Sequence, residues 1–120
     1  MARILVVEDN AQNRKLAQLV LQKGGHEVLC AEGGEEGVRL AREHLPDLVL
    51  MDIQMPGMDG IEATRVLRAG ATTAGLKIIA LTALAMKGDA ERILAAGCDA
   101  YLAKPYHYNE LIAVVDRALA

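Results

Sequence analysis

The sequence predicts an α/β protein with a parallel sheet covered by helices on both faces. Short apolar runs of strand length alternate five times with longer segments in which apolar residues recur at helical spacing. The run at residues 48–51 is apolar at every position and lies between Pro46 and Pro56, as in a strand buried on both faces. Right-handed crossovers between such strands place helices on both sides of the sheet.

Most of the expected strands end in a polar residue. The first and third runs end in the acids Glu8 and Asp52, the fourth ends in Thr82, and the fifth ends in Lys104 before Pro105. The second run is the weakest of the five. The expected strands are residues 3–8, 26–31, 47–52, 77–82 and 99–104.

The first two expected helices have recognisable ends. Asn10 can cap the first helix, and Gly24 and Gly25 stop it. Glu35 and Glu36 suit the start of the second helix, which residue 46, a proline, ends. Apolar positions recur at helical spacing in both helices, and in the first they are Leu16, Leu19 and Val20, continued by Lys23.

The last three expected helices follow the third, fourth and fifth strands. Asp59 and Glu62 resemble a capping box for a helix that runs to about Arg68, followed by a loop at residues 70–75. Residues 89–97 are helical with a glycine stop, and residues 86–88 are a candidate first turn. The final helix spans residues 107–120 and carries on one face Leu111, Ile112, Val115 and Leu119.

Length and composition favour one compact domain at residues 1–120. The chain has three Tyr, no Phe and no Trp, so its core must be aliphatic. It contains no linker, repeat or low-complexity segment, and its last expected helix reaches residue 120, so we expect no second domain; Met1, just before the first expected strand, would suit a native start. Cys30 and Cys98 lack metal-ligand spacing and are expected to be reduced and buried.

Charge and hydropathy exclude two classes of partner. The net charge is −3 and there is no basic run, so direct nucleic-acid binding is not expected. No apolar run approaches the ~20 residues that span a bilayer, and no secretory segment is evident, so we expect a cytoplasmic protein. The three histidines, for which we expect no chemistry and positions far from the acid-bearing strand ends, are His26, His44 and His107.

The polar residues at the strand ends should meet. Parallel strands point the same way, so their carboxyl ends share one edge of the sheet, where ligands of α/β proteins bind. The residues expected at this edge are Glu8, Asp9, Asp52, Thr82 and Lys104. Singly each has an ordinary structural explanation, but together they make a cluster of acids with one hydroxyl and one ammonium.

Such a cluster suits phosphoryl chemistry assisted by a metal. Three carboxylates held close repel one another, and a hard divalent ion with oxygen ligands, Mg²⁺, is the natural relief. With that charge neutralised, Asp52 can attack a phosphoryl group and form an acyl phosphate. Lys104 would pair with one phosphoryl oxygen and Thr82 would donate a hydrogen bond to another.

The chain resembles the receiver domain of two-component response regulators along essentially its whole length. The likeness rests on the order and spacing of Glu8-Asp9, Asp52, Thr82-Ala83 and Lys104-Pro105, and the segment 52–60 looks like the family's phosphorylation loop. The segments 82–89 and 97–105 are closest to single-domain regulators of the cell-division type and to receivers of hybrid kinases. The resemblance implies a flavodoxin-like, doubly wound sheet of five strands with five helices.

The resemblance also implies roles for individual residues. Asp52 would accept phosphate from a phosphohistidine. The Mg²⁺ ligands would be Asp9 and Asp52 directly, Glu8 through water, and Gln54 through its backbone carbonyl. Lys104 would bridge the phosphoryl group and the acids, and the peptide bond before Pro105 would be cis.

A conformational switch is implied as well. Tyr101 lies where the family keeps an aromatic that turns inward when Thr82 moves to the phosphate, and Met86 and Lys87 are expected on a recognition surface. The protein would be a switch and not an enzyme, its only reactions being self-phosphorylation from a phosphodonor and autodephosphorylation. Its partners would be a sensor histidine kinase or a histidine phosphotransfer protein, and a target bound through the fourth helix, fifth strand and fifth helix.

Three other functions would use parts of the same pattern. A phosphatase of the haloacid dehalogenase type expects a second Asp two places after the first, where Gln54 stands. A flavodoxin-like flavin carrier needs a phosphate-binding first loop, which Glu8 and Asp9 would repel. A phosphorylation-independent receiver-like interaction scaffold is the remaining alternative, and its usual signature, a missing acid, Thr or Lys, is absent from this sequence.

Overall fold

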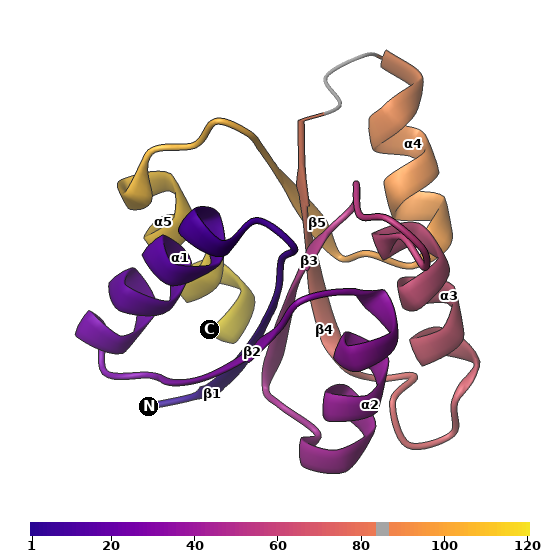
Figure 1. Cartoon of the computed structure of the whole chain (residues 1–120), viewed down its shortest axis with the longest axis horizontal. Coiled ribbons are helices and arrows are strands. Elements are labelled where there is room, and N and C mark those ends of the chain that lie inside the picture. The colour runs from indigo at the N-terminus through magenta and orange to yellow at the C-terminus, as the bar shows by residue number, and fades with distance from the viewer. Residues whose placement is uncertain (84–86) are drawn as a thin grey trace.

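The computed structural model describes residues 1–83 and 87–120, with the side chain of Lys87 excepted. Strands and helices alternate along the whole chain (Figure 1). The elements are β1 (Arg3–Val7), α1 (Ala11–Lys23), β2 (Glu27–Ala31), α2 (Gly34–His44), β3 (Leu48–Asp52), α3 (Gly60–Ala69), β4 (Lys77–Thr82), α4 (Lys87–Ala96), β5 (Ala100–Ala103) and α5 (Tyr108–Leu119). The predicted α/β class is confirmed. The recognition surface expected at Met86 and at the Lys87 side chain lies outside the described residues.

The five strands form one parallel sheet in the order β2-β1-β3-β4-β5. This is the doubly wound order of flavodoxin-like folds, in which the strand order reverses between β1 and β3. Val7 pairs with Met51, and Asp52 pairs with Leu81, so the carboxyl ends of β1, β3 and β4 lie side by side. The topology therefore brings the chain segments after these strands to one edge.

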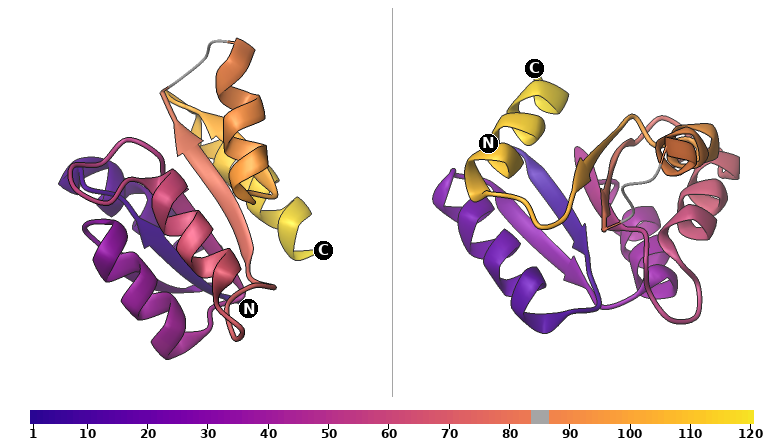
Figure 2. Two further views of the ribbon diagram at one scale, coloured as in Figure 1. Left: turned by 90° about the vertical axis from the view of Figure 1, so that its right-hand side faces the viewer. Right: turned by 90° about the horizontal axis from the view of Figure 1, so that it is seen from above.

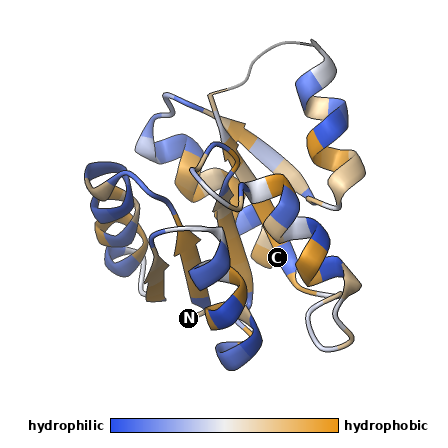
Figure 3. Ribbon diagram, turned by 45° about the vertical axis from the view of Figure 1, so that its right-hand side comes forward, coloured by the Kyte–Doolittle hydropathy of each residue, from blue (hydrophilic) through white to orange (hydrophobic). Residues whose placement is uncertain are grey.

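The helices divide between the two faces of the sheet, with α1 and α5 on one face and α2, α3 and α4 on the other (Figures 1 and 2). Because side chains alternate along a strand, each face has its own core. Leu5 and Val7 of β1 pack under α2, whereas Ile4 and Val6 pack under α1 and α5. Figure 3 shows the apolar strands enclosed by helices whose outer surfaces are largely polar.

The sequence signals at the helix ends are partly as expected. Asn10 accepts a hydrogen bond from the Asn13 N–H, and Asp59 accepts one from the Glu62 N–H. The structure shows a capping box with both bonds at α5 instead, where His107 accepts from the Asn109 N–H and its own N–H donates to the Glu110 carboxylate. The strands expected at residues 3–8, 26–31 and 47–52 are each one residue shorter in the structure, and the strand expected at residues 99–104 is two residues shorter.

The buried face of α1 differs from the stripe of apolar residues read along the sequence. The side chains that α1 buries are Ala17 and Leu21, whereas Leu16 and Leu19 are exposed. Both cysteines are free thiols, and Cys98 is buried while Cys30 is half-buried. Within the described part of the chain, no helix combines the length and apolar character needed to cross a bilayer.

Candidate functional site

The acids, the hydroxyl and the ammonium predicted at the strand ends do lie on the carboxyl edge of the sheet. Asp52 and Thr82 are the last residues of β3 and β4, Glu8 and Asp9 follow β1, and Lys104 follows β5. The backbone carries the two outer segments to the edge through ordinary sheet bonds: the Glu8 N–H donates to the Ala31 carbonyl, and the Lys104 N–H donates to the Thr82 carbonyl. Asp52 at the centre is thus flanked by all the others.

Three carboxyl groups lie close together at the centre of this site. One carboxylate oxygen from each of Glu8, Asp9 and Asp52 lies within 4.8 Å of the others. Glu8 and Asp52 are only 1% and 3% exposed, whereas Asp9 faces solvent. The cluster is therefore open on the Asp9 side and closed beneath Glu8 and Asp52.

Lys104 joins the two buried acids. Its Nζ lies 2.6 Å from Glu8 Oε1 and 3.4 Å from Asp52 Oδ2. The peptide bond between Lys104 and Pro105 is cis, as the family resemblance implied. One ammonium between two carboxylates leaves the site with excess negative charge, and Asp9 adds to it.

The electrostatics of the buried pair follow from this geometry. Burial, and then the hydrogen bond and negative charge of Glu8, raise the pKa of Asp52 to about 8. Burial also opposes ionisation of Glu8, but its hydrogen bonds with Asp52 and Lys104 hold the pKa of Glu8 below its usual value. At neutral pH and without a cation, the two carboxyl groups hold about one proton as a coupled pair, chiefly on Asp52.

Lys104 remains charged in this environment. Burial disfavours the ammonium, but the hydrogen bond to Glu8 and the charges of Asp52 and Glu8 outweigh it and raise the pKa of Lys104. The site therefore keeps the Lys104 ammonium beside the Asp52 carboxyl group, whose proton a bound metal ion would displace.

The donor set fits a hard divalent metal ion. Among the described residues, the one buried side-chain oxygen that lacks a hydrogen-bond partner is Glu8 Oε2. This lone acceptor belongs to the same cluster as the Asp9 and Asp52 carboxylates, and oxygen-only ligands of this kind suit Mg²⁺. A cation here would relieve both the unpaired oxygen and the repulsion that raises the pKa of Asp52.

The other predicted residues lie around the cluster. Thr82 is fully buried at the end of β4, next to β3. The Gln54 N–H donates to Asp52 Oδ1 at 3.1 Å, which fixes the orientation of that carboxylate from the loop after β3. Tyr101 lies on β5 beside Ala80 of β4, and its side chain is 45% exposed.

Arg14 and Gly60 support the loops that carry the acids, and neither was predicted from the sequence. The Arg14 guanidinium donates to the Glu8 backbone carbonyl at 2.9 Å and to Glu32 at 3.3 Å, so it holds the loop that carries the acids. Gly60 permits the loop after Asp52 to turn back, because a Cβ there would collide with the Asp52 carbonyl oxygen and lie 2.8 Å from Ile53 Cα. The position of Arg14, one turn into the helix after Glu8 and Asp9, was the available signal for the first.

The histidines are distributed differently from the expectation. His26 accepts a hydrogen bond from the Ala2 N–H at the opposite edge of the sheet, and His44 ends α2. His107, however, begins α5 three residues after Lys104, on the same edge as the acids, where it caps the helix.

The chain is similar to known proteins along nearly its whole length. The chain matches the response regulator receiver domain over residues 4–116. It is 43% identical over 112 residues to the polar-differentiation response regulator DivK of Brucella ovis, covering 93% of this chain and 91% of that protein. The solved receiver domain of sensor histidine kinase PA1611 from Pseudomonas aeruginosa PAO1, with a magnesium ion coordinated in its active-site cleft, is 40% identical with a TM-score of 0.91, covering 98% and 97%. The chemotaxis protein CheY4 of Vibrio cholerae is 28% identical with a TM-score of 0.94, covering 99% of each chain.

Proposed function

Because the chain belongs to the response regulator receiver domain family of two-component signalling, we propose that residues 1–120 are a phosphorylation switch whose phosphoacceptor is Asp52. The observation that carries the proposal is the bridge from Lys104 Nζ to Glu8 and Asp52 at the carboxyl edge of the sheet. Receiver domains are signalling switches and not classical enzymes, and they interact with histidine kinases or phosphotransfer proteins.

Mg²⁺ is the proposed cofactor. Asp9 and Asp52 would hold the ion directly, Glu8 through water, and Gln54 through its backbone carbonyl. When bound, the ion supplies charge neutralisation for the carboxylates and for the oxygens of an incoming phosphoryl group. The magnesium ion described in the PA1611 receiver domain supports this proposal.

The proposed reaction is transfer of a phosphoryl group from a phosphohistidine. An oxygen of the Asp52 carboxylate attacks phosphorus, the bond from phosphorus to the histidine nitrogen breaks, and the electron pair of that bond stays on the imidazole. Lys104 stabilises the phosphoryl oxygens during transfer through its charge, and the Thr82 hydroxyl donates a hydrogen bond to one of them once the group is on Asp52. Hydrolysis of the resulting acyl phosphate by water returns the switch to its original state.

The output is a change of surface. Thr82 moves toward the phosphoryl group, and Tyr101, now exposed, turns inward beside β4. Converting a two-state element from 1:99 to 99:1 requires about 5.5 kcal/mol. Charge-assisted hydrogen bonds from Thr82 and Lys104, at roughly 1.5 to 3 kcal/mol each, supply much of it. The changed surface would comprise α4, β5 and α5, on which a target binds.

Intact mass spectrometry with acetyl phosphate tests this function. With Mg²⁺ the protein should gain one phosphoryl group, and hydroxylamine should remove it because acyl phosphates are labile to that nucleophile. Omission of Mg²⁺ and the isosteric variant Asp52→Asn are the matched controls, and both should remain unlabelled. Labelling of wild-type protein that is equal with and without Mg²⁺ would contradict the metal's role.

A further inference from the structure

Helix α4 is attached to the rest of the fold unevenly. Of residues 88–96, the part of α4 whose side chains are described, Ile93 and Ala96 are buried, and both lie in the last four residues of the helix. The five residues before Ile93 are exposed or half-buried. The first turn of α4 projects beyond the other helices (Figures 1 and 2). Packing therefore holds α4 mainly at its carboxyl end.

The chain just after α4 is held by Arg68, which lies in the last turn of α3. Its Nε donates to the Gly97 carbonyl at 2.8 Å, and its Nη2 lies 3.0 Å from Asp99 Oδ2. The Nη1 of the same guanidinium donates to the carbonyls of Ala74 and Leu76, in the loop before β4. One planar group with several donors in fixed geometry thus joins the end of α3, this loop and the corner between α4 and β5.

Three further contacts fix the same corner, residues 97–99. Gly97 has a φ of +113°, and a Cβ at this position would lie 2.7 Å from Arg68 Cγ, so the arginine stem packs directly on the glycine. The Sγ of buried Cys98 lies 3.6 Å from Thr64 Oγ1 of α3. The carboxylate that Arg68 contacts also accepts the Ile78 N–H of β4 at 2.8 Å. The corner is therefore joined to both α3 and the sheet.

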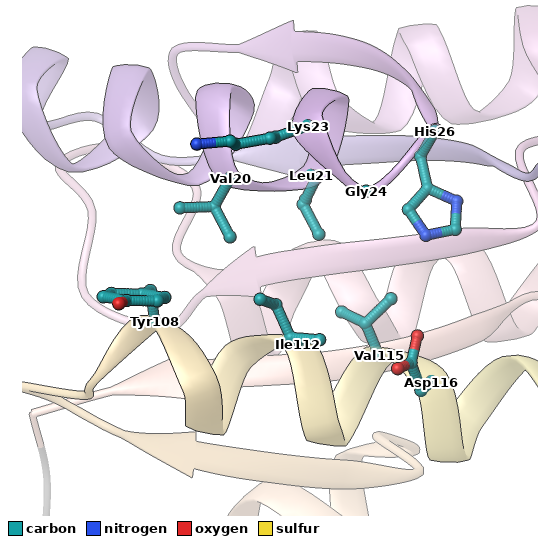
Figure 4. Close-up of a pocket in the computed structure, with 9 residues that line it drawn as sticks. All are labelled: Val20, Leu21, Lys23, Gly24, His26, Tyr108, Ile112, Val115 and Asp116. Atoms are coloured by element: carbon teal, nitrogen blue, oxygen red, sulfur yellow. The ribbon is translucent and has the colours of Figure 1, made fainter.

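Helix α5, which like α4 contacts β5, is held along most of its length. Its buried side chains are Leu111 in its first half and Val115 in its second half. Figure 4 shows α5 facing α1 from Tyr108 to Asp116, on the face of the sheet opposite α4. Of these two helices, α4 is therefore the one whose attachment is concentrated at one end.

We propose that Arg68 is a positioning residue that anchors the carboxyl end of α4, so that the helix tilts about a pivot at residues 97–99 when the switch operates. Residues 83–86 join Thr82 to the amino end of α4, so the proposed movement of Thr82 acts on that end. Because α4 spans ten residues, or about 15 Å, a displacement of about 1 Å at its first turn tilts it by about 4°. The proposal rests on the phosphorylation switch at Asp52 and adds the contact that confines the movement to one end of the helix.

Amide chemical shifts, recorded by NMR before and after phosphorylation with acetyl phosphate and Mg²⁺, test the pivot. In the wild type the shift changes should be at least about threefold larger at residues 88–92 than at residues 93–99. In Arg68→Met, which removes every donor of the side chain, the changes should extend through residues 93–99. Arg65→Met is the matched control, because Arg65 is exposed one turn earlier on α3, and it should keep the wild-type distribution. A purely structural role of Arg68 would alter the shifts of the corner without redistributing the response to phosphorylation.

Arg68→Lys replaces Arg68→Met if circular dichroism shows that the latter has lost helix. It should give an intermediate distribution, because one ammonium cannot reproduce the fork of a guanidinium. Equal shift changes at residues 88–92 and 93–99 of the wild type would overturn the pivot, as would an Arg68→Met protein that keeps the wild-type distribution. Intact mass of the same samples separates the two proposals. A phosphorylated wild type with uniform shift changes contradicts the pivot alone, whereas a wild type that gains no phosphoryl group contradicts the switch and the pivot with it.

Discussion

Lys104 Nζ lies 2.6 Å from Glu8 Oε1, although 96 residues separate these two side chains in the sequence. The bond links the segment after β5 to the segment after β1, across the two strands between them. Lys104 also reaches Asp52, so two buried acids share one ammonium. Glu8 raises the pKa of Asp52 and Lys104 lowers it, so both partners influence the charge state of Asp52.

Replacing Lys104 with Met should slow phosphorylation by acetyl phosphate at least about tenfold. The change removes the cation that lowers the pKa of Asp52 and that would pair with a phosphoryl oxygen. The initial rate of labelling, followed by intact mass, measures the effect. Lys104→Arg is the control for charge. A Met variant that labels at the wild-type rate would remove Lys104 from the transfer step.

Thr82→Ala should spare labelling and reduce the response. In the proposed switch the hydroxyl acts after transfer, when buried Thr82 would move to the phosphate and exposed Tyr101 would turn inward. Amide chemical shifts of β5 and α5, recorded by NMR before and after acetyl phosphate is added, should change far less in the variant than in the wild type. Loss of labelling in Thr82→Ala would show that transfer itself needs the hydroxyl.

Asp52→Asn should be more stable than the wild type at alkaline pH when divalent cations are removed. The folded-state pKa of Asp52, about 8, lies above the ordinary value of 3.8, so the folded protein retains a proton that the unfolded chain releases. The contribution of Asp52 to the free energy of unfolding is fully present below about pH 4, and it is lost as the pH rises through about 8. The advantage of Asn should therefore grow between about pH 4 and pH 8, by up to about 1.4 kcal/mol for each pH unit, and level off above about pH 8.

Urea denaturation followed by circular dichroism in the presence of EDTA measures this difference. Mg²⁺ should reduce it, because a cation stabilises the ionised Asp52 of the folded wild type. A difference that stays constant across the pH range would contradict the raised pKa of Asp52.

Arg14→Gln should weaken Mg²⁺ binding several-fold. The guanidinium holds the Glu8 carbonyl at 2.9 Å, and without it the loop that carries Glu8 and Asp9 is less fixed. Isothermal titration calorimetry with Mg²⁺ measures the affinity. Glu32→Gln is the matched control, because it removes the ion pair of Arg14 but leaves the bond to the carbonyl. Equal loss in both variants would assign the effect to the ion pair.

The sequence predicted the sheet and its edge because both depend on local patterns. The runs before Glu8 and Asp52 are apolar enough to be strands in any context, and parallel strands must bring their ends together. The hydrogen bond between Lys104 and Glu8 could not be predicted from local patterns, because it depends on the order of the strands in the sheet. Arg14 was missed because its partner is a backbone carbonyl, which no residue type reveals.

The sequence also did not predict which side chains of α1 face solvent. Leu16 and Leu19 have the spacing of a core stripe, but the sheet under α1 accepts the smaller Ala17 together with Leu21. Helical spacing indicates which residues share a face, and the contact with β1 and α5 decides which face is buried.

Borohydride trapping of the phosphorylated protein tests the central assignment most directly. Borohydride reduces an aspartyl phosphate to homoserine, and peptide mass mapping then locates the altered residue. Protein treated with acetyl phosphate and Mg²⁺ should carry homoserine at position 52, and at no other aspartate, with none in untreated protein. Homoserine at position 9, 59 or another aspartate in place of 52 would contradict the account.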